Sequence, residues 1–333
     1  MTGLRKHIED FAGKKIAVVG DIVADQFLYG TISRVSREAP VFILRHDETE
    51  TRPGGAGNAA ANVASLGATP LLIGYAGTDE NSNLLSKALA ERGIDLDRIV
   101  FDAGIRTTTK VRVLAGQHYA PRQQVIRIDH EHRGGIASEI RGKLVATVEA
   151  SLSLCDSIIV SDYGYGVIDD AMFKVVKKIA SERGIPLLVD SRYSLSKFTG
   201  ATASTPNQDE VEQILGKGFS DADCVRLASD LEMKALLVTC GNEGMLMIAN
   251  GNTLRLPAVG STTPVDVTGA GDTVISVFAL GIASGLDFAD AAQIANHAGG
   301  IVVMKKGTAA VTASELIASI ERENTTMTSE AAS

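Results

Sequence analysis

The residues with the clearest chemical potential run from Asp266 to Asp272 (DVTGAGD), directly ahead of an apolar stretch that predicts a helix. A glycine-rich turn over 269–271 that opens a helix aims backbone N–H groups and the positive end of the helix dipole at one point. The turn is therefore a cradle for an anion such as a transferring γ-phosphate. Asp272 reaches the same point, where its carboxylate can accept the proton of an attacking hydroxyl. The alternative, an aspartate that caps the helix after a glycine turn, is commoner for so short a pattern.

A second pattern spans Pro53–Gly67 (PGGAGNAAANVASLG). Gly54 and Gly55, followed by a helix of small residues, let the backbone come close to a ligand. Asn58 and Asn62 share one helix face at a spacing of four, and either amide could bond sugar hydroxyls. Tight packing of a strand against a helix, with a capping asparagine, accounts for the pattern equally well.

The elements that must position these residues alternate between short apolar runs and helix-like segments. Continuous apolar runs are typical of a parallel sheet covered on both faces, which predicts an α/β fold. Sites in such sheets lie beyond the carboxyl ends of the strands, where Asp21, Asp162, Asp190 and Gly241 fall. The predicted strands are Ile16–Val19, 71–77, 157–163, 186–192 and 235–241, and the predicted helices are 57–66, 80–92, 138–153, 169–183, 207–215 and 220–232.

Two stretches break this alternation. Residues 41–50 and 106–129 are rich in β-branched side chains and alternate in polarity, as exposed antiparallel strands do. We expect them to pair as a small sheet beside the main one, either as a lid over the active site or as a dimer contact. The polar tail 321–333 is expected to be frayed.

Composition limits the classes of function. Of the 333 residues 45% are hydrophobic and 22% are charged, as in a soluble globular protein, and the net charge of −8 disfavours general nucleic-acid binding. Cys155, Cys224 and Cys240 form no C-x-x-C pair, which favours free thiols in a reducing cytoplasm over a zinc site. No leader is evident in Met1–Lys15, and no uncharged apolar run reaches 18 residues, so membrane spanning is not expected. Length alone suggests about two domains.

Taken together, the segments 54–67 and 266–272 resemble the two signatures of the ribokinase/PfkB carbohydrate kinases. The resemblance extends from Val18 to about Val311 and implies one ribokinase-like α/β domain over 1–320, with a β-sheet lid, in place of two domains. It implies transfer of the γ-phosphate of ATP to a sugar hydroxyl, with Mg²⁺ as cofactor. The residues implied to act in this step are Gly269, Ala270, Gly271 and Asp272, the last as catalytic base.

Within that family the chain most resembles the kinases of D-glycero-β-D-manno-heptose 7-phosphate, through the segments 20–41, 52–68, 108–114, 123–129 and 160–166. The resemblance implies that Asp25 and Asn58 hold sugar hydroxyls and that Lys110, Arg112 and Arg127 face the substrate's phosphate. Lys110 and Arg112 are two apart on a strand and so point to one face. Such pairs on an edge strand are more often solvated charges that prevent aggregation. The full implied substrate set is Asp25, Gly54, Gly55, Asn58, Lys110, Arg112, Arg127 and Asp162.

The nucleotide side is also implied by the resemblance. In TPNQDE (205–210), Asn207 and Glu210 match an N-x-x-E element that organises Mg²⁺ and phosphates through water. Asn207 could equally cap a helix, with Glu210 as its capping-box partner. Asp266 and nearby carbonyls could hold a monovalent cation such as K⁺. The residues implied to line the nucleotide pocket are Asn207, Glu210, Thr239, Gly241, Gly244 and Asn296.

Four positions depart from the pattern. Val277 stands where the family signature usually has Ala or Gly, on the buried side of a helix. Tyr165 replaces a usual Lys of the heptose phosphate kinases, and Ser191-Arg192 replaces a usual Pro-Lys. Arg192 restores one charge and Tyr165 does not, so the departures bear on the identity of the sugar and leave kinase chemistry in place.

We therefore predict a cytoplasmic kinase that phosphorylates heptose 7-phosphate at O1 and feeds ADP-heptose and lipopolysaccharide core synthesis. The length predicts a kinase separate from any nucleotidyltransferase and dimeric through its lid strands. A PfkB-family kinase for another sugar or a nucleoside is one alternative, favoured by Tyr165 and Ser191. A non-catalytic sensor of nucleotide or sugar phosphate is another, disfavoured by Asp272 and its cradle. A dinucleotide-binding oxidoreductase is excluded because GDIVAD (20–25) is not a G-x-G-x-x-G turn.

Overall fold

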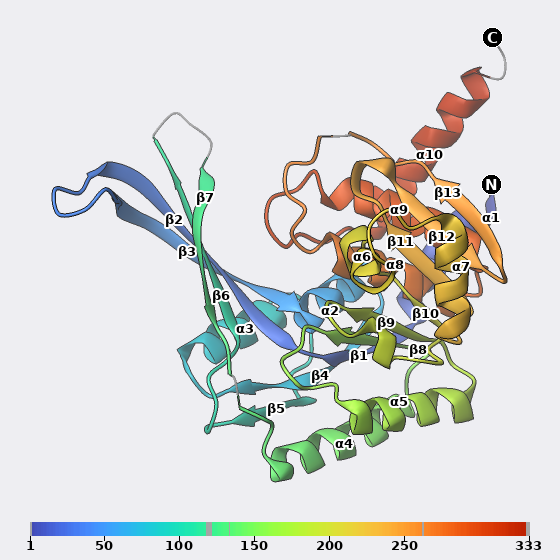
Figure 1. Cartoon of the computed structure of the whole chain (residues 1–333), viewed down its shortest axis with the longest axis horizontal. Helices are drawn as coiled ribbons and strands as arrows, with labels where there is room; N and C mark the ends of the chain where they lie inside the picture. The colour runs from blue at the N-terminus through green and yellow to red at the C-terminus, as the bar shows by residue number, and fades with distance from the viewer. Residues whose placement is uncertain (1, 118–121, 133, 262, 331–333) are drawn as a thin grey trace.

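The computed structural model describes residues 2–117, 122–132, 134–261 and 263–330, and it places a nine-stranded sheet at the centre of the molecule (Figure 1). The strands follow the order β13-β12-β11-β10-β9-β8-β1-β4-β5, and all neighbours are parallel except β11–β12 and β12–β13. Four short strands, β5, β12 and β13 at or beside the edges and β10 inside the sheet, were not predicted. The bounds are β1 Lys15–Gly20, β4 Thr69–Gly77, β5 Ile99–Asp102, β8 Ser157–Asp162, β9 Leu187–Ser191, β10 Ala203–Ser204, β11 Ala235–Thr239, β12 Met245–Ala249 and β13 Asn252–Leu256.

Helices cover both faces of this sheet, as the continuous apolar strands predicted, and each face has its own hydrophobic core. Successive residues of a strand pack alternately into the two cores. Ile159 and Leu188 belong to the first core, and Ile158 and Val189 belong to the second. The first core lies under α1 Thr2–Glu9, α2 Ala56–Ser65, α3 Glu80–Ala90, α8 Ala270–Ala283, α9 Phe288–Val302 and α10 Ala313–Glu330. The second lies under α4 Ser138–Leu152, α5 Asp170–Arg183, α6 Gln208–Leu215 and α7 Asp221–Asp230.

A separate four-stranded sheet, the lid sheet, projects from the main body in the order β3-β2-β6-β7 (Figure 1). Its strands are β2 Ile22–Val35, β3 Phe42–Gly55, β6 Thr109–Gly116 and β7 Gln123–His130. The two predicted stretches are present, but β2 was not predicted as a lid strand. The reason is that only Asp21 separates β1 from β2, and the first β2 residues are as buried and apolar as a core strand.

The C-terminal segment differs from the expected frayed tail. Helix α10 runs from Ala313 to Glu330, and Leu316 and Ile320 anchor its first turns in the first core. Of the helices in the described residues, none combines the length and apolar content needed to cross a membrane.

Candidate active site

The predicted base, Asp272, lies in the first turn of α8. Gly269 adopts a left-handed φ of 81° and is the residue that precedes the helix, so Asp272 is not the N-cap. Its side chain is 3% exposed, Oδ2 accepts a hydrogen bond from Asn58 Nδ2 at 2.7 Å, and Oδ1 accepts one from the Tyr163 hydroxyl at 3.0 Å. The capping alternative therefore does not hold for Asp272.

Burial raises the pKa of Asp272 to about 6, although the bonds from Asn58 and Tyr163 stabilise the ionised form and lower it. Both of these partners are neutral, so neither gives the carboxylate the full charge compensation of an ion pair. A base whose pKa lies just below neutral is ionised at pH 7 and still holds a proton well enough to accept one during reaction.

Helix α2 brings the second sequence pattern against this carboxylate. A Cβ atom at Gly54 would lie 2.6 Å from Asp25 Oδ2, and Gly55 has a φ of 57°, so both positions require glycine. Asn62 is fully buried: its Oδ1 accepts a hydrogen bond from Thr273 Oγ1 at 2.9 Å, which ties α2 to α8. Of the two candidate amides, Asn58 reaches the site and Asn62 has a structural role.

The lid sheet supplies positive charge to the same site. Asp25 on β2 is 5% exposed and pairs in register with Lys110 on β6, while Arg112 Nη2 lies 3.2 Å from Asp25 Oδ1. Burial raises the pKa of Asp25, and the two cations oppose that rise. Arg112 Nε is buried and has no hydrogen-bond partner among the described residues. Arg127 stands opposite Arg112 on β7, is exposed, and binds Asp129 through two 2.9 Å hydrogen bonds.

Tyr163, which was not among the predicted site residues, contacts both Asp272 and the lid sheet. Lys110 Nζ lies 5.3 Å from the centre of the Tyr163 ring, and the Arg192 guanidinium lies 5.5 Å from it. Lys110 also lies 5.7 Å from the Tyr165 ring, and the Tyr165 hydroxyl donates to Glu131 at 3.0 Å. The missed signal lies in the alternation along β8: Ile159 belongs to the first core, and Tyr163, directly after the strand, keeps the same parity and reaches Asp272 of α8.

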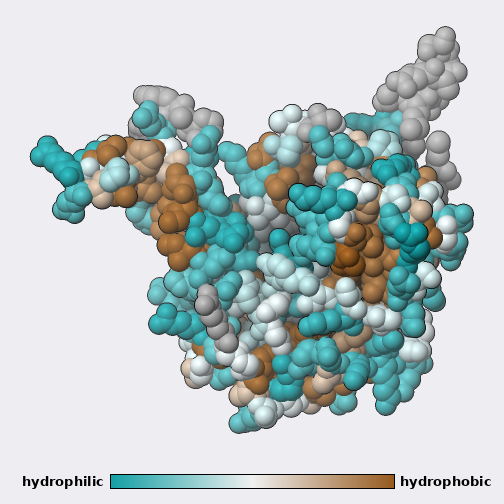
Figure 2. Space-filling view, in the orientation of Figure 1, coloured by the Kyte–Doolittle hydropathy of each residue, from teal (hydrophilic) through white to brown (hydrophobic). Residues whose placement is uncertain are grey.

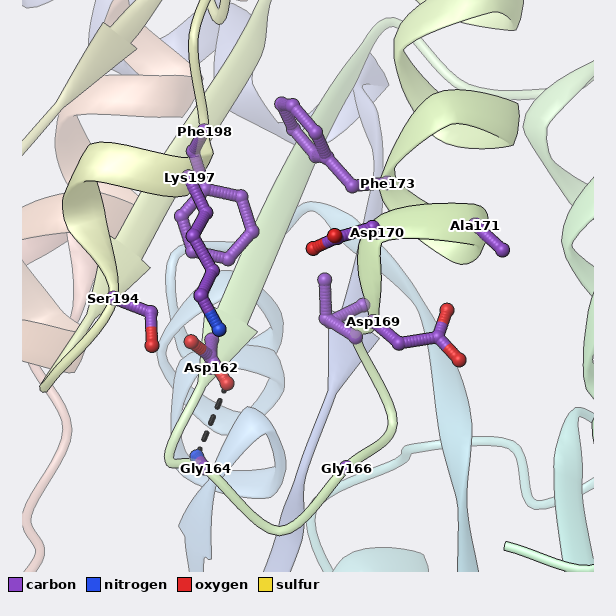
Figure 3. A pocket seen from close by; sticks show the side chains of 11 residues that line it. Asp162, Gly164, Gly166, Asp169, Asp170, Ala171, Phe173, Ser194, Lys197 and Phe198 are labelled. Carbon is purple, nitrogen blue, oxygen red and sulfur yellow. Dashed lines mark hydrogen bonds between the residues drawn. The ribbon is translucent and has the colours of Figure 1, made fainter. Parts of the chain in front are cut away.

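By the same alternation, Asp162 faces the other side of the sheet from Asp272. It lines a cavity of about 550 Å³ between the start of α5 and the segment 194–198, drawn in Figure 3. Asp162 Oδ1 accepts from Gly164 N at 3.0 Å, and Oδ2 accepts from Ser191 Oγ at 2.7 Å. The structure thus separates Asp162 from the other predicted substrate residues.

On the nucleotide side, Asn207 and Glu210 form the full capping box of α6. Asn207 N donates to Glu210 Oε2 at 2.9 Å, and Glu210 N donates to Asn207 Oδ1 at 2.8 Å. Thr239, at the end of β11, forms a bridge with Asn207. The capping alternative is confirmed, and it holds these side chains at the carboxyl edge of the sheet.

The remaining nucleotide-side residues support the turns around β13 and α9. Gly244 has a φ of 93°, and a Cβ atom there would meet Leu256 O at 2.0 Å. Asn296 Nδ2 donates to Pro257 O at 2.7 Å. Gly241 is exposed, in a left-handed turn after β11.

Asp266 joins the cradle to a neighbouring loop. Its Oδ1 accepts from Thr268 N and its Oδ2 from Gly307 N, both at 2.9 Å. Within the described residues, no group of three or more His, Cys, Asp or Glu side chains is arranged to hold a metal ion. A metal at this site would therefore depend on phosphate and water ligands beside one or two carboxylates, the arrangement that Mg²⁺ prefers.

Comparisons with known sequences show which proteins this chain resembles. The family profile described as pfkB family carbohydrate kinase matches residues 14–315. The bifunctional protein HldE of Trichlorobacter lovleyi is 39% identical over 317 residues, which are 93% of this chain and 63% of the relative. The HldE protein of Citrifermentans bemidjiense is 39% identical over 95% of this chain and 66% of its own length. The chain thus spans slightly less than two thirds of these relatives.

Solved structures identify the fold as ribokinase-like. Arabidopsis thaliana ribokinase, complexed with ribose and ATP, has a TM-score of 0.70 at 19% identity and covers 92% of this chain and 98% of its own. Phosphofructokinase-2 from Escherichia coli, in complex with potassium, has a TM-score of 0.70 at 17% identity and covers 91% of this chain and 96% of its own. The predicted fold class is confirmed.

Proposed function

This chain belongs to the pfkB family of carbohydrate kinases and is a phosphotransferase with a sugar hydroxyl as acceptor, and from that premise we propose that it phosphorylates D-glycero-β-D-manno-heptose 7-phosphate at O1, using ATP. The observation that carries the proposal is that two unlike regions, the α8 turn and the lid sheet, meet at Tyr163. Asp272 and its cradle supply a base and an anion site, and the lid sheet faces them with Lys110 and Arg112.

In the proposed reaction, Asp272 takes the proton of the attacking hydroxyl. Its buried carboxylate is held by Asn58 and Tyr163, which leaves further lone pairs on both oxygens for the substrate. The backbone N–H groups of Gly269 and Gly271 would stabilise the charge on the transferring phosphoryl group, whereas Ala270 N already donates to Val267 O at 3.2 Å. Positioning and electrostatic stabilisation supply most of the catalysis in such transfers.

The phosphate already on the substrate would lie against the cationic face of the lid sheet. The buried Arg112 Nε has a donor without a partner among the described residues, and a phosphate oxygen would satisfy it. Lys110 is half-buried. Burial lowers its pKa, and the charge of Asp25, which is the second-largest influence, raises it. Asp25 and Asn58 would bind sugar hydroxyls between the phosphate and Asp272.

Two cations would assist. Glu210, whose Oε2 accepts a hydrogen bond from Asn207 N, would help to hold Mg²⁺ through Oε1, and the ion would neutralise phosphate charge. A monovalent cation such as K⁺ would lie beside Asp266, where the turn at Thr268 meets the loop at Gly307. The Escherichia coli phosphofructokinase-2, which shares this fold, has been solved in complex with potassium.

We also propose that two copies associate through their lid sheets. Figure 2 shows apolar side chains gathered along these strands, and the exposed ones are Val35, Val41, Phe42, Val125, Ile126 and Ile128. A second copy that covers them would remove these apolar side chains from water. Sedimentation equilibrium of the wild type and of Phe42→Glu tests this: a dimer that dissociates in the variant supports it, and a monomeric wild type overturns it.

The function itself is tested by ADP release from Mg-ATP against heptose 7-phosphate, fructose 6-phosphate, ribose and adenosine. Turnover on the heptose phosphate supports the proposal, and preference for another acceptor overturns the heptose assignment while keeping the kinase. ATP binding with no turnover on any acceptor favours the sensor alternative. Asp170→Asn is a matched control for Asp272→Asn, because Asp170 also lies in a helix's first turn but is exposed, on the opposite face.

A further inference from the structure

We propose that Tyr163 is a positioning residue for the catalytic base: its hydroxyl fixes the Asp272 carboxylate and favours its ionised form. The inference rests on the proposed function, because it concerns the base of that reaction. The Tyr163 hydroxyl donates to Asp272 Oδ1 at 3.0 Å, while Asn58 donates to the other oxygen at 2.7 Å. The two bonds come from different elements, so together they fix the plane of the carboxylate.

The backbone at Tyr163 is itself fixed by hydrogen bonds to a buried carboxylate. Asp21, 1% exposed, accepts through Oδ2 from Tyr163 N at 2.8 Å and from Tyr165 N at 3.0 Å, and through Oδ1 from Val167 N at 3.1 Å. One buried carboxylate thus binds three backbone N–H groups of the segment 163–167. This segment cannot shift without breaking those bonds, so the phenol ring has a defined position.

Two cations also lie close to the Tyr163 ring. Lys110 of the lid sheet lies 5.3 Å from the ring centre, and Arg192, after β9, lies 5.5 Å from it. Contacts of this kind stabilise a ring by about 0.5–1 kcal/mol where exposed and more where desolvated. They depend on the ring and not on its hydroxyl, so Tyr163→Phe removes the bond to Asp272 and keeps both cation contacts.

The charges that face Asp272 come from several elements. Asp25 on the lid sheet raises its pKa, and Arg192 after β9 lowers it. Asp190 at the end of β9 is a further carboxylate in the group, and burial raises the pKa of Asp190 well above its usual range. Burial likewise raises the pKa of Tyr163 well above its usual range, so its hydroxyl stays protonated and donates at every working pH.

The test is the pH profile of kcat/KM for the wild type and Tyr163→Phe. A bond to a charged group contributes about 1.5–3 kcal/mol, and a pKa unit corresponds to about 1.4 kcal/mol. We expect the acid limb of Tyr163→Phe to move up by about one pH unit and kcat at pH 8 to fall about tenfold, with the sugar KM within about threefold of the wild type. The control is Tyr75→Phe, which removes a buried hydroxyl that donates to Tyr165 O and does not reach Asp272.

A second measurement separates this inference from the proposed function. Titration of the Asp272 carboxyl by ¹³C NMR, with the wild type, Tyr163→Phe and Asp272→Asn for assignment, needs no turnover. A rise in its pKa in Tyr163→Phe supports positioning even if no sugar is phosphorylated, which would overturn the proposed function alone. An unchanged pKa and an unchanged acid limb in a folded Tyr163→Phe overturn the role of Tyr163.

Discussion

Asp272 in the main body and Asp25 in the lid sheet are both buried carboxylates of one site, yet their hydrogen-bond partners differ in charge. Asp272 receives hydrogen bonds from two neutral groups, Asn58 and Tyr163, whereas Asp25 is ion-paired with Arg112 at 3.2 Å. Burial raises the pKa of both. A carboxylate with neutral partners can take up a proton without breaking an ion pair, and a paired carboxylate holds its cation in place. Under the proposed function, the main body would supply the base and the lid sheet would bind the substrate's phosphate.

The largest expected effect is on the main-body side of this comparison. Asp272→Asn keeps the shape of the side chain and removes the proton acceptor, so we expect kcat to fall by about 10²–10⁴-fold. Steady-state ADP release measures this, and isothermal titration with ATP should show binding within about threefold of the wild type. A variant with near-normal kcat would show that another group accepts the proton, and Asp170→Asn should match the wild type.

On the lid side, the expected effect is on binding. Arg112→Ala removes an ion pair and leaves Asp25 buried without it, and loss of a charged hydrogen bond costs about 1.5–3 kcal/mol. We expect the KM for the sugar phosphate to rise about 10–100-fold, with kcat changed only about threefold. The control is Arg45→Ala, because Arg45 is a lid arginine whose side chain is 69% exposed. A fall in kcat at constant KM would contradict the division of roles.

The raised pKa of Asp272 also makes the stability of the protein depend on pH. A folded pKa of about 6 for Asp272, above the usual 3.8, means that the native state binds more protons between these values than the unfolded state does. This contribution to stability is therefore present below pH 4 and is lost as the pH rises through 6. Asp272→Asn should raise the free energy of unfolding by up to about 3 kcal/mol at pH 8, and the gain should vanish near pH 4. Urea unfolding at both pH values measures it; a gain independent of pH would contradict the charge explanation.

A smaller effect is expected at the turn before α8. Gly269→Ala places a Cβ atom 2.5 Å from Asn58 Nδ2 at a φ of 81°, so it adds strain and displaces a partner of Asp272. Gly184→Ala is the matched control, with a φ of 63° and nothing within 4 Å of the new atom. Both should lose about 1–2 kcal/mol of stability through the left-handed backbone. In addition only Gly269→Ala should lose about tenfold in kcat, and equal rates would mean that the Asn58 bond is dispensable.

Parts of the fold and site that depend on local pattern could be predicted from sequence. The core strands are continuous apolar runs, and the two glycine motifs require close backbone approach that only glycine permits, as at Gly54 and Gly269. What could not be predicted depends on contacts between distant segments. Asn58 and Tyr163 meet at Asp272 only after α2, β8 and α8 have packed together. Asp162 was placed in the site by its position at a strand end, but strand parity turns it to the other face.

The smallest expected effect concerns Tyr165, where heptose 7-phosphate kinases usually carry lysine. Tyr165 holds Glu131 through its hydroxyl at 3.0 Å and lies beneath Lys110, with 5.7 Å between the amine and the ring centre. Tyr165→Lys exchanges a cation–π contact, worth about 0.5–1 kcal/mol, for one more positive charge beside Lys110. For a phosphorylated sugar the added charge should lower KM by about 2–5-fold, and for the same sugar without phosphate KM should not fall. Tyr193→Lys, at a residue that is 73% exposed, adds the same charge on a neighbouring loop and should change neither value. If Tyr165→Lys lowers KM equally for both sugars, the lid sheet does not bind the substrate's phosphate. Its cations would then contact another part of the sugar or the nucleotide.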